Sequence, residues 1–289
     1  MTTVSALAVD AALLPDLGGD AGGFVGSVHS VFTSVVNVSA ADDQLWSLAA
    51  RRVPAGPRTV RLAVDAMDDL GLDPGTPVRA RGSLLFAGDV VVDLAEAAPW
   101  QPAAIPGPVR PDRLAAVDAA LAEFGLAGGA RPGADPFSRA VAARIADSLD
   151  LIADAVARDD AVALRAAASA LIGLGTGLTP AGDDVLTGLA FTAAQLGGPL
   201  AAITAAVAAV AVPGTTHAVS LTALHQACAG RAVQPLVDVL AAVCGQGDAG
   251  RLPETVAALV AIGHTSGTDL AYGLLAAAHL SQSLQTPTK

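Results

Sequence analysis

The residues best suited to chemistry lie between positions 173 and 184, in the segment GLGTGLTPAGDD. Thr179 before Pro180 is typical of a helix start, with Thr179 as the N-cap. Glycines at close spacing can adopt positive φ and expose backbone N–H groups. They are Gly173, Gly175, Gly177 and Gly182. Because a helix N-terminus attracts anions, this segment predicts a binding site for a phosphate or carboxylate group.

Two adjacent carboxylates, Asp183 and Asp184, stand in the first turn of that predicted helix. They suit the helix dipole, but they repel an anionic ligand unless Mg²⁺, a cationic group or a shared proton intervenes. Neighbouring helical residues diverge by about 100°, so both reach one metal only near the helix axis or before the helix begins. We keep Mg²⁺ at Asp183 and Asp184 as one expectation. The other is a solvent-exposed polar face behind an ordinary helix-ending loop.

A second break between helices reads GHTSGTDL and starts at Gly263. His264 is a candidate general acid or base, whereas Ser266 and Asp269 resemble a capping box. Gly267 belongs to the same candidate site. A third helix start carries Thr216 and Ser220, and N-capping explains its threonines adequately. Three such starts can converge on one cleft, so we expect Asp183 or Asp184 within about one ligand's width of His264 or Asp269.

Several chemistries lack their motifs. The chain has no P-loop, no strand-preceded dinucleotide motif, no G-x-S-x-G, no C-x-x-C and no H-E-x-x-H, and its five histidines lack metal-ligand spacing. No organic cofactor is therefore indicated. Cys228 and Cys244 are too few for a disulfide framework, which favours buried thiols in a cytoplasmic protein.

The elements around these residues divide into two classes. Residues 24–93 show β-like runs separated by turn signals, including a hairpin at 84–92, and five prolines follow between 99 and 111. Beyond them, apolar residues recur at helical spacing. The predicted helices cover 112–124, 135–158, 161–172, 180–196, 200–212, 216–229, 233–244, 253–262 and 267–284. We therefore expect an α+β chain with a small, mostly antiparallel β domain or barrel (1–98), a proline-rich linker (99–111) and a larger all-α domain (112–289).

The amino-acid composition argues against some classes of binding partner. Of 289 residues, 53% are hydrophobic and 15% charged, and the net charge is −11. An acidic chain is a poor ligand for nucleic acid or an anionic membrane. The longest apolar run, Leu200 to Val212, is shorter than a membrane span, and no basic region precedes an apolar stretch at the N-terminus. We expect a cytoplasmic protein that binds a small anion locally.

The two Gly-flanked segments, together with Ser220 and the β-then-helical layout, resemble a bacterial family that includes the AllH subunit of oxamate carbamoyltransferase, an enzyme of anaerobic allantoin breakdown. Thr176 and Ala181 depart mildly from the pattern of that family. The resemblance implies carbamoyl-group chemistry, with carbamoyl phosphate or another small anionic metabolite as ligand and with partner subunits.

Our leading hypothesis is a subunit that transfers a carbamoyl group between an oxamate-like metabolite and phosphate. In it, the glycine loop and Thr179 hold the anion, Asp183 and Asp184 hold Mg²⁺ or an amide N–H₂, and His264 handles a proton. One alternative is a non-catalytic metabolite-binding subunit of a multi-subunit enzyme. The other is a metal-dependent phosphate-ester hydrolase built on Asp183 and Asp184.

Overall fold

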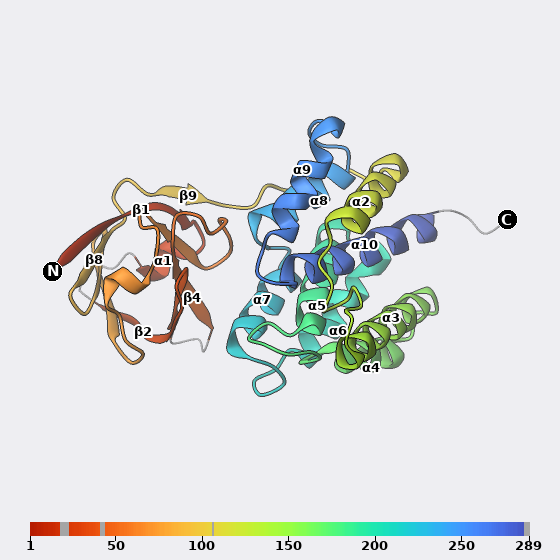
Figure 1. Cartoon of the computed structure of the whole chain (residues 1–289), viewed down its shortest axis with the longest axis horizontal. Helices are drawn as coiled ribbons and strands as arrows, with labels where there is room; N and C mark the ends of the chain where they lie inside the picture. The colour runs from red at the N-terminus through yellow and green to blue at the C-terminus, as the bar shows by residue number, and fades with distance from the viewer. Residues whose placement is uncertain (18–22, 41–43, 106, 286–289) are drawn as a thin grey trace. The chain divides into compact units, whose positions relative to one another are not determined.

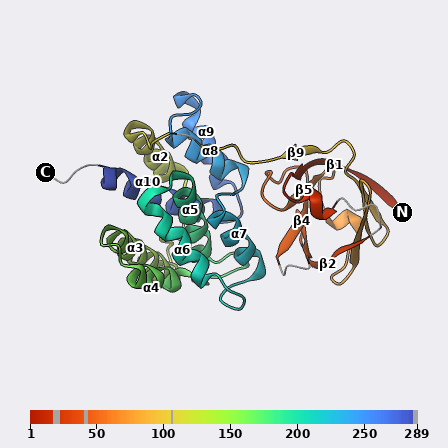
Figure 2. The ribbon, with the colours of Figure 1, turned by 180° about the vertical axis from the view of Figure 1, so that it is seen from behind.

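The computed structural model describes residues 1–17, 23–40, 44–105 and 107–285, so residue 106 of the expected linker lies outside the described part. Contacts divide the chain into two compact units, Met1–Pro102 and Ala103–Lys289. Each has its own hydrophobic core. Figures 1 and 2 show strands in the first unit and helices in the second, so the α+β class is as expected.

The first unit is a closed β-barrel. Eight strands follow one another around it in the order β1, β5, β4, β3, β2, β6, β7 and β8, which pairs again with β1, while β9 adds to β1 outside this ring. The strands are β1 Thr2–Asp10, β2 Gly23–Val31, β3 Val35–Ser39, β4 Leu45–Ala49, β5 Thr59–Leu62, β6 Pro77–Arg81, β7 Leu84–Ala87, β8 Val90–Asp93 and β9 Ala98–Trp100. Helix α1 (Leu14–Leu17) and the 3₁₀ turn η1 (Asp68–Leu70) lie between strands.

The expectation of a mostly antiparallel β domain is wrong, because the barrel is mixed. Strand β1 runs parallel to β8 and to β9, and β4 runs parallel to β5. Turn signals reveal only consecutive strands, such as the β7–β8 hairpin, which is antiparallel as predicted. Parallel partners cannot be joined by a tight turn, so a turn signal does not mark them. Strand β1 precedes the β-like region recognised in the sequence and pairs with distant strands, so no turn motif predicts it.

The barrel follows from alternating side chains. In β6, Val78 and Ala80 are buried while Arg79 and Arg81 are exposed, which is the period of two expected for a strand with one face inward. The interior collects large apolar side chains, among them the buried Trp46. Closure leaves the eight strands of the ring without a free edge.

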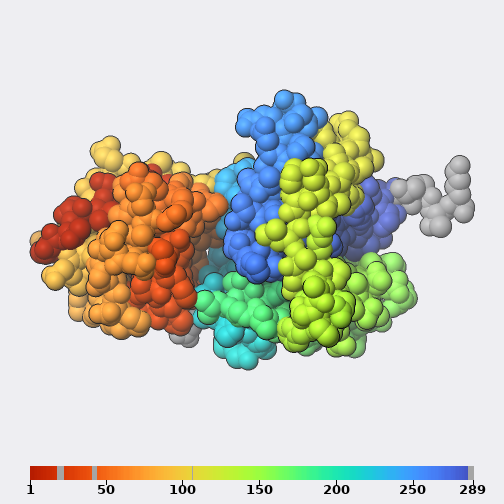
Figure 3. Space-filling model, in the orientation of Figure 1, coloured from red at the N-terminus to blue at the C-terminus, as the bar shows by residue number. Residues whose placement is uncertain are grey.

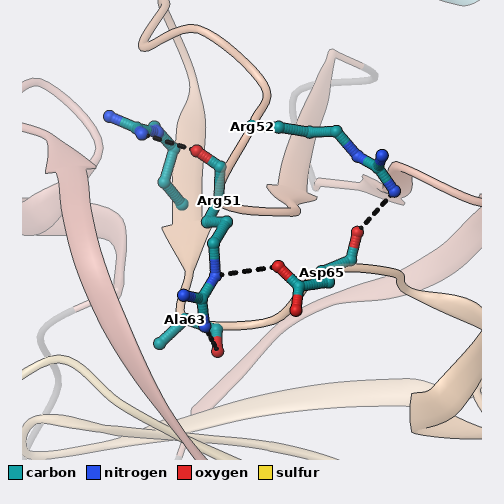
Figure 4. Close-up of polar contacts among 5 residues, drawn as sticks. Arg51, Arg52, Ala63 and Asp65 are labelled. Carbon is teal, nitrogen blue, oxygen red and sulfur yellow. Dashed lines mark hydrogen bonds and ion pairs between the residues drawn. The ribbon is translucent and has the colours of Figure 1, made fainter.

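Arginines tie down the connections beside β4 and β5. The guanidinium of Arg51 donates to the carbonyl of Ala63 at 2.8 Å and pairs with the Asp65 carboxylate at 3.2 Å, and Arg52 donates to the carbonyl of Asp65 at 2.8 Å (Figure 4). Arg61 donates to the carbonyl of Arg51 at 2.7 Å. The ion pair is exposed, so we expect about 0–1 kcal/mol from it, and the backbone contacts matter more for loop shape.

The second unit is helical, and among the described residues after 111 there is no strand. Its helices are α2 Pro111–Phe124, α3 Pro136–Ala157, α4 Ala161–Leu171, α5 Ala181–Leu196, α6 Ala201–Val210, α7 Ala218–Cys228, α8 Gln234–Val243, α9 Leu252–Val260 and α10 Ser266–Gln285, with 3₁₀ turns η2 Gly198–Leu200 and η3 Ala249–Arg251. Each α-helix begins and ends within two residues of its predicted range. Within the described ranges, no helix is both long and apolar enough to cross a membrane.

Helices α5 and α10 form the centre of this unit. Every residue of α5 from Ala181 to Ala193 is buried. A Cβ at Gly188 would lie 2.0 Å from the carbonyl oxygen of Leu270, and a Cβ at Gly273 would lie 2.0 Å from that of Val185, so the two backbones touch reciprocally. The interpretation of the polar face of α5 as solvent-exposed is therefore wrong. Small residues on that face allow the helices to approach closely.

Candidate functional site

The two Gly-flanked loops meet. The hydroxyl oxygens of Thr179 and Ser266, which are 87 residues apart in the chain, lie 3.0 Å from each other. Thr179 precedes α5 and Ser266 begins α10, so both helix N-termini lie at the same end of the unit. The prediction that these two loops lie together in space is confirmed. Thr179 does not cap α5, because Pro180 occupies the N-cap position and no side chain caps the helix.

A cavity of about 490 Å³ opens between these loops. One wall consists of residues 175–179 with Ala181, and residues 263–266 continue it. A second part of the wall comes from Gly128 and the start of α3. Small-molecule sites have volumes of roughly 300–1,000 Å³, so the cavity suits a small metabolite with room for water.

The glycine loop presents unpaired donors. Within the described part of the chain, the backbone N–H groups of residues 175–179 and of Ala181 donate no hydrogen bond. By contrast, the N–H of Gly182 donates to the carbonyl of Leu174, and those of Asp183 and Asp184 donate to that of Pro180. Free N–H groups at a helix N-terminus are the usual ligands of phosphate and carboxylate oxygens.

The four glycines of this loop have two different tasks. Gly175 and Gly177 line the cavity with φ of 116° and 91°, values that side-chain-bearing residues rarely adopt. Gly173 and Gly182 lie outside the lining. A Cβ at Gly182 would come within 2.0 Å of the carbonyl oxygen of Leu171, so α5 starts in direct backbone contact with the end of α4.

Asp183 is a structural clamp. It is 1% exposed, and its Oδ1 accepts a hydrogen bond from the N–H of Gly173 at 2.7 Å. Its Oδ2 accepts one from the hydroxyl of Thr216. The hydroxyl of Thr215 instead donates to the carbonyls of Val210 and Val212. N-capping of α7 is therefore not what these threonines do, and Thr216 joins the start of α7 to the glycine loop.

Asp184 has a different environment. It is 8% exposed, and its Oδ2 has no hydrogen-bond partner among the described residues. Burial raises the pKa of this carboxyl well above its usual value, the negative charges of Asp269 and Asp183 raise it further, and the nearby hydroxyls of Ser266 and Thr179 oppose the rise. The shift is toward the neutral form, in which Asp184 would repel an anion much less.

Asp269 binds the loop between α2 and α3. Its side chain is fully buried, and its Oδ1 accepts a hydrogen bond from the N–H of Ala130 at 2.6 Å. Burial raises the pKa of this carboxyl to about 6, against hydrogen bonds from Ala130 and Thr265 that lower it. The capping-box interpretation of Ser266 and Asp269 is therefore wrong, because the carboxylate binds the loop between α2 and α3 instead.

The other predicted residues surround the cavity at different depths. His264 is exposed and lines it. The hydroxyl of Ser220 is 3.4 Å from the carbonyl oxygen of Leu178, so this residue supports the glycine loop from α7. A Cβ at Gly267 would lie 1.9 Å from the carbonyl oxygen of Leu259, which brings α10 against the end of α9. The three aspartates at 183, 184 and 269 lie behind the lining.

The comparisons match both parts of the chain. Residues 171–278 match the family described as oxamate carbamoyltransferase subunit AllH, and residues 5–99 match the AllH family N-terminal domain. The chain belongs to the AllH family. The first match contains both loops of the cavity, and the resemblance found in the sequence is thereby confirmed. No curated protein and no solved structure matches this AllH-family chain.

In this AllH-family chain, the adjacent aspartates do not fit a Mg²⁺ site built from protein side chains alone. Both oxygen atoms of Asp183 accept hydrogen bonds from the protein. The described residues also contain no cluster of three His, Cys, Asp or Glu able to hold a metal ion. Mg²⁺ usually takes one or two carboxylates together with substrate phosphates, so Mg²⁺ at this position stays a prediction.

Sequence reasoning missed the α2–α3 loop and an internal repeat. The loop carries Gly128, Gly129 and Gly133, a density that signals close backbone approach. The repeat is the pattern G-x-D-aliphatic-x-x-G, which occurs at 182–188 and again at 267–273. Its two copies make the reciprocal contacts between α5 and α10. A search for internal similarity at this spacing finds it, because the glycines and aspartates occupy equivalent helical positions.

Proposed function

We propose that this chain is a carbamoyltransferase subunit whose cavity binds phosphate, or the phosphate group of carbamoyl phosphate, at the adjoining N-termini of α5 and α10. A carbamoyl group then moves between an oxamate-like metabolite and phosphate. The observation that carries the proposal is a row of backbone N–H groups at residues 175–179. These residues line the cavity, and their N–H groups lack an acceptor in the described part of the chain. The family name supports a subunit role with partner subunits.

Local charge supports anion binding in an acidic chain. The net charge of −11 repels anions at long range. At the cavity, each helix N-terminus acts as roughly half a positive charge, and α5 and α10 supply two of them. Asp184 opposes them less than an exposed aspartate would, because burial raises its pKa. The anion is therefore held by fixed dipoles and hydroxyls, without a lysine or arginine among the described residues that line the cavity.

The reaction forms one bond at the carbamoyl carbon and breaks another. In one direction a phosphate oxygen attacks this carbon, the bond from the carbon to the oxamate nitrogen breaks, and the nitrogen takes up a proton. In the other direction the amide nitrogen attacks carbamoyl phosphate, loses a proton and releases phosphate. His264 lines the cavity, and histidine is the side chain that most often serves as a general acid or base, so we assign that proton to His264.

A second candidate is a non-catalytic subunit that binds the metabolite for a partner subunit. One observation favours it: Asp183, Asp184 and Asp269 lie behind the cavity lining, which leaves His264 with most of the acid–base work. The metal-dependent hydrolase is less well supported, since Asp183 is already engaged by two donors. Phosphatase activity that survives EDTA, or no such activity across a metabolite panel, would remove that third option.

The experiment measures binding and turnover on the full chain. Titration calorimetry with inorganic phosphate and carbamoyl phosphate, with and without Mg²⁺, reports the anion site and the predicted metal. Carbamoyl transfer is then assayed with the chain alone and with its partner subunits. We expect His264→Gln to lower kcat by roughly 10²- to 10⁴-fold and to leave the Kd for phosphate within a few-fold.

The matched control is His279→Gln. His279 lies on the same helix as Ser266, near its other end, where it pairs with Asp118 at 2.9 Å. We expect this variant to keep full turnover. Failure of phosphate to bind the wild type contradicts the proposal. Phosphate binding with unchanged turnover in His264→Gln favours the metabolite-binding subunit instead.

A further inference from the structure

The second wall of the cavity comes from a part of the chain outside both family matches. Residues Gly128, Asp135, Phe137, Ser138 and Val141 form this wall, whereas the matches cover 5–99 and 171–278. The glycine-loop wall offers hydrogen-bond donors. The α3 wall differs in chemistry, since it offers a carboxylate, a hydroxyl and apolar surface.

The first turn of α10 positions this wall. The hydroxyl of Thr268 accepts a hydrogen bond from the N–H of Leu126 at 2.9 Å, and Asp269 accepts one from Ala130 at 2.6 Å. A Cβ at Gly129 would lie 2.3 Å from the Asp269 carboxylate, so the loop passes directly over it. Figure 3 shows the yellow-green atoms of the α2–α3 segment beside the blue atoms of the C-terminal helices. The wall is thus fixed to the helix that supplies Ser266.

Asp135 brings a fixed negative charge to this wall. It is the N-cap of α3, where Oδ1 accepts from the N–H of Ser138 at 2.9 Å and Oδ2 from its hydroxyl at 2.6 Å. These hydrogen bonds lower the pKa of the carboxyl, so it is ionised at neutral pH. A carboxylate has about four acceptor positions, of which Ser138 uses two. The carboxylate can therefore still accept hydrogen bonds from a ligand.

We propose that Asp135 determines specificity by accepting a hydrogen bond from the primary amide N–H₂ of a small anion that binds in the cavity beside the phosphate held by the N–H groups of residues 175–179. Phe137, which is 58% exposed and lines the cavity, offers its ring to the flat amide. The site then selects an anion with an amide at its far end and rejects one with a second carboxylate, because that group would face Asp135. This inference rests on the proposed function and specifies its substrate class.

The competing explanation is that Asp135 serves only as a helix cap. Asp135→Asn separates the two roles, because asparagine caps helices as well as aspartate does but carries no charge. Asp135→Ser is a second variant that also keeps a capping oxygen. The matched control is Asp160→Asn, at the N-cap of α4, where the carboxylate accepts from the N–H groups of Val162 and Ala163 and does not line the cavity.

The test compares oxamate with oxalate, which has a carboxylate where oxamate has its amide, and with inorganic phosphate, by titration calorimetry on the full chain. We expect the wild type to prefer oxamate. We expect Asp135→Asn and Asp135→Ser to lose about ten- to a hundred-fold of the oxamate-to-oxalate preference, the range for a hydrogen bond to a charged group, and to bind phosphate at least as tightly. Asp160→Asn should keep the wild-type preference.

The outcomes are distinguishable. If Asp135→Asn keeps the wild-type ratio, or changes both affinities equally, the inference is overturned and the proposed function stands. A wild type that binds phosphate but not oxamate also overturns the inference, while the anion site of the proposed function stands. A wild type that binds none of the three ligands overturns both proposals.

Discussion

Replacing Asp269 by asparagine should stabilise the helical unit at alkaline pH. Asp269 is fully buried, and its pKa is raised to about 6 from a usual value of 3.8. Asparagine keeps the oxygen that accepts the hydrogen bond from Ala130 and imitates the neutral acid. The variant therefore removes the cost of burying a charge while the loop contact remains.

The sign and size of this stability difference follow from proton linkage. A carboxyl whose pKa is raised in the folded state contributes stability that is fully present below about pH 4 and is lost as the pH rises through about 6. The shift of about two pKa units corresponds to about 3 kcal/mol of lost stability at pH 8. Roughly half of that loss is already present at pH 5, so the variant should gain about 1.5 kcal/mol on the wild type between pH 5 and pH 8.

The assay is urea unfolding of the full chain at both pH values, monitored by the circular dichroism signal of the helices. Repulsion from the net charge of −11 weakens wild type and variant almost equally, so only their difference is compared. Asp183→Asn is the matched control and should lower stability at both pH values, because an amide nitrogen replaces an oxygen that accepts a hydrogen bond. Parallel pH profiles for the wild type and Asp269→Asn would refute the reasoning.

Two further predictions concern the packing of α5 against α10 and the hydrogen bonds of Asp183. Gly188→Ala should destabilise the helical unit by about 1–3 kcal/mol or more, because the new Cβ would lie 2.0 Å from the carbonyl oxygen of Leu270. Gly250→Ala, whose Cβ would make an ordinary 3.6 Å contact, should leave the Tm nearly unchanged, and equal shifts would contradict the packing argument. Thr216→Val should cost about 1–3 kcal/mol by removing the hydroxyl that bonds Asp183. Thr204→Val is its control, since that hydroxyl bonds only the exposed carbonyl of Ala201, and the argument fails if both variants unfold alike.

The helices could be predicted because their signals are local. Apolar spacing of three and four residues and glycine-containing breaks located α2 to α10 within two residues. The mixed barrel could not be predicted in this way. Two of its three parallel pairs join β1 to β8 and β9, which lie some eighty or more residues further along the chain. Such pairing depends on the tertiary fold, and turn residues between neighbouring strands carry no information about it.

The candidate site shows the same limit. The loops at 173–184 and 263–269 were recognisable because capping residues, glycines and carboxylates are concentrated there. Their meeting was predicted as a condition for one ligand, and the 3.0 Å contact between Thr179 and Ser266 bears it out. The α2–α3 wall was not predicted, because its link to the site is a hydrogen bond between Ala130 and Asp269. No local pattern encodes a partner 139 residues away.

The two adjacent aspartates illustrate why spacing alone misled the assignment of roles. Side chains one position apart diverge by about 100°, so Asp183 reaches Gly173 and Thr216 while Asp184 lies near Ser266 and Thr179. The electrostatic partner of Asp184 outside its own helix is Asp269. Each is the fourth residue of its helix, in the two copies of the G-x-D-aliphatic-x-x-G repeat. Because Gly188 and Gly273 let the helices touch reciprocally, the repeat places two carboxyls together behind the cavity. Two buried carboxyls in such proximity favour protonation of at least one of them, which is how an acidic pair can stand behind an anion site without repelling its ligand.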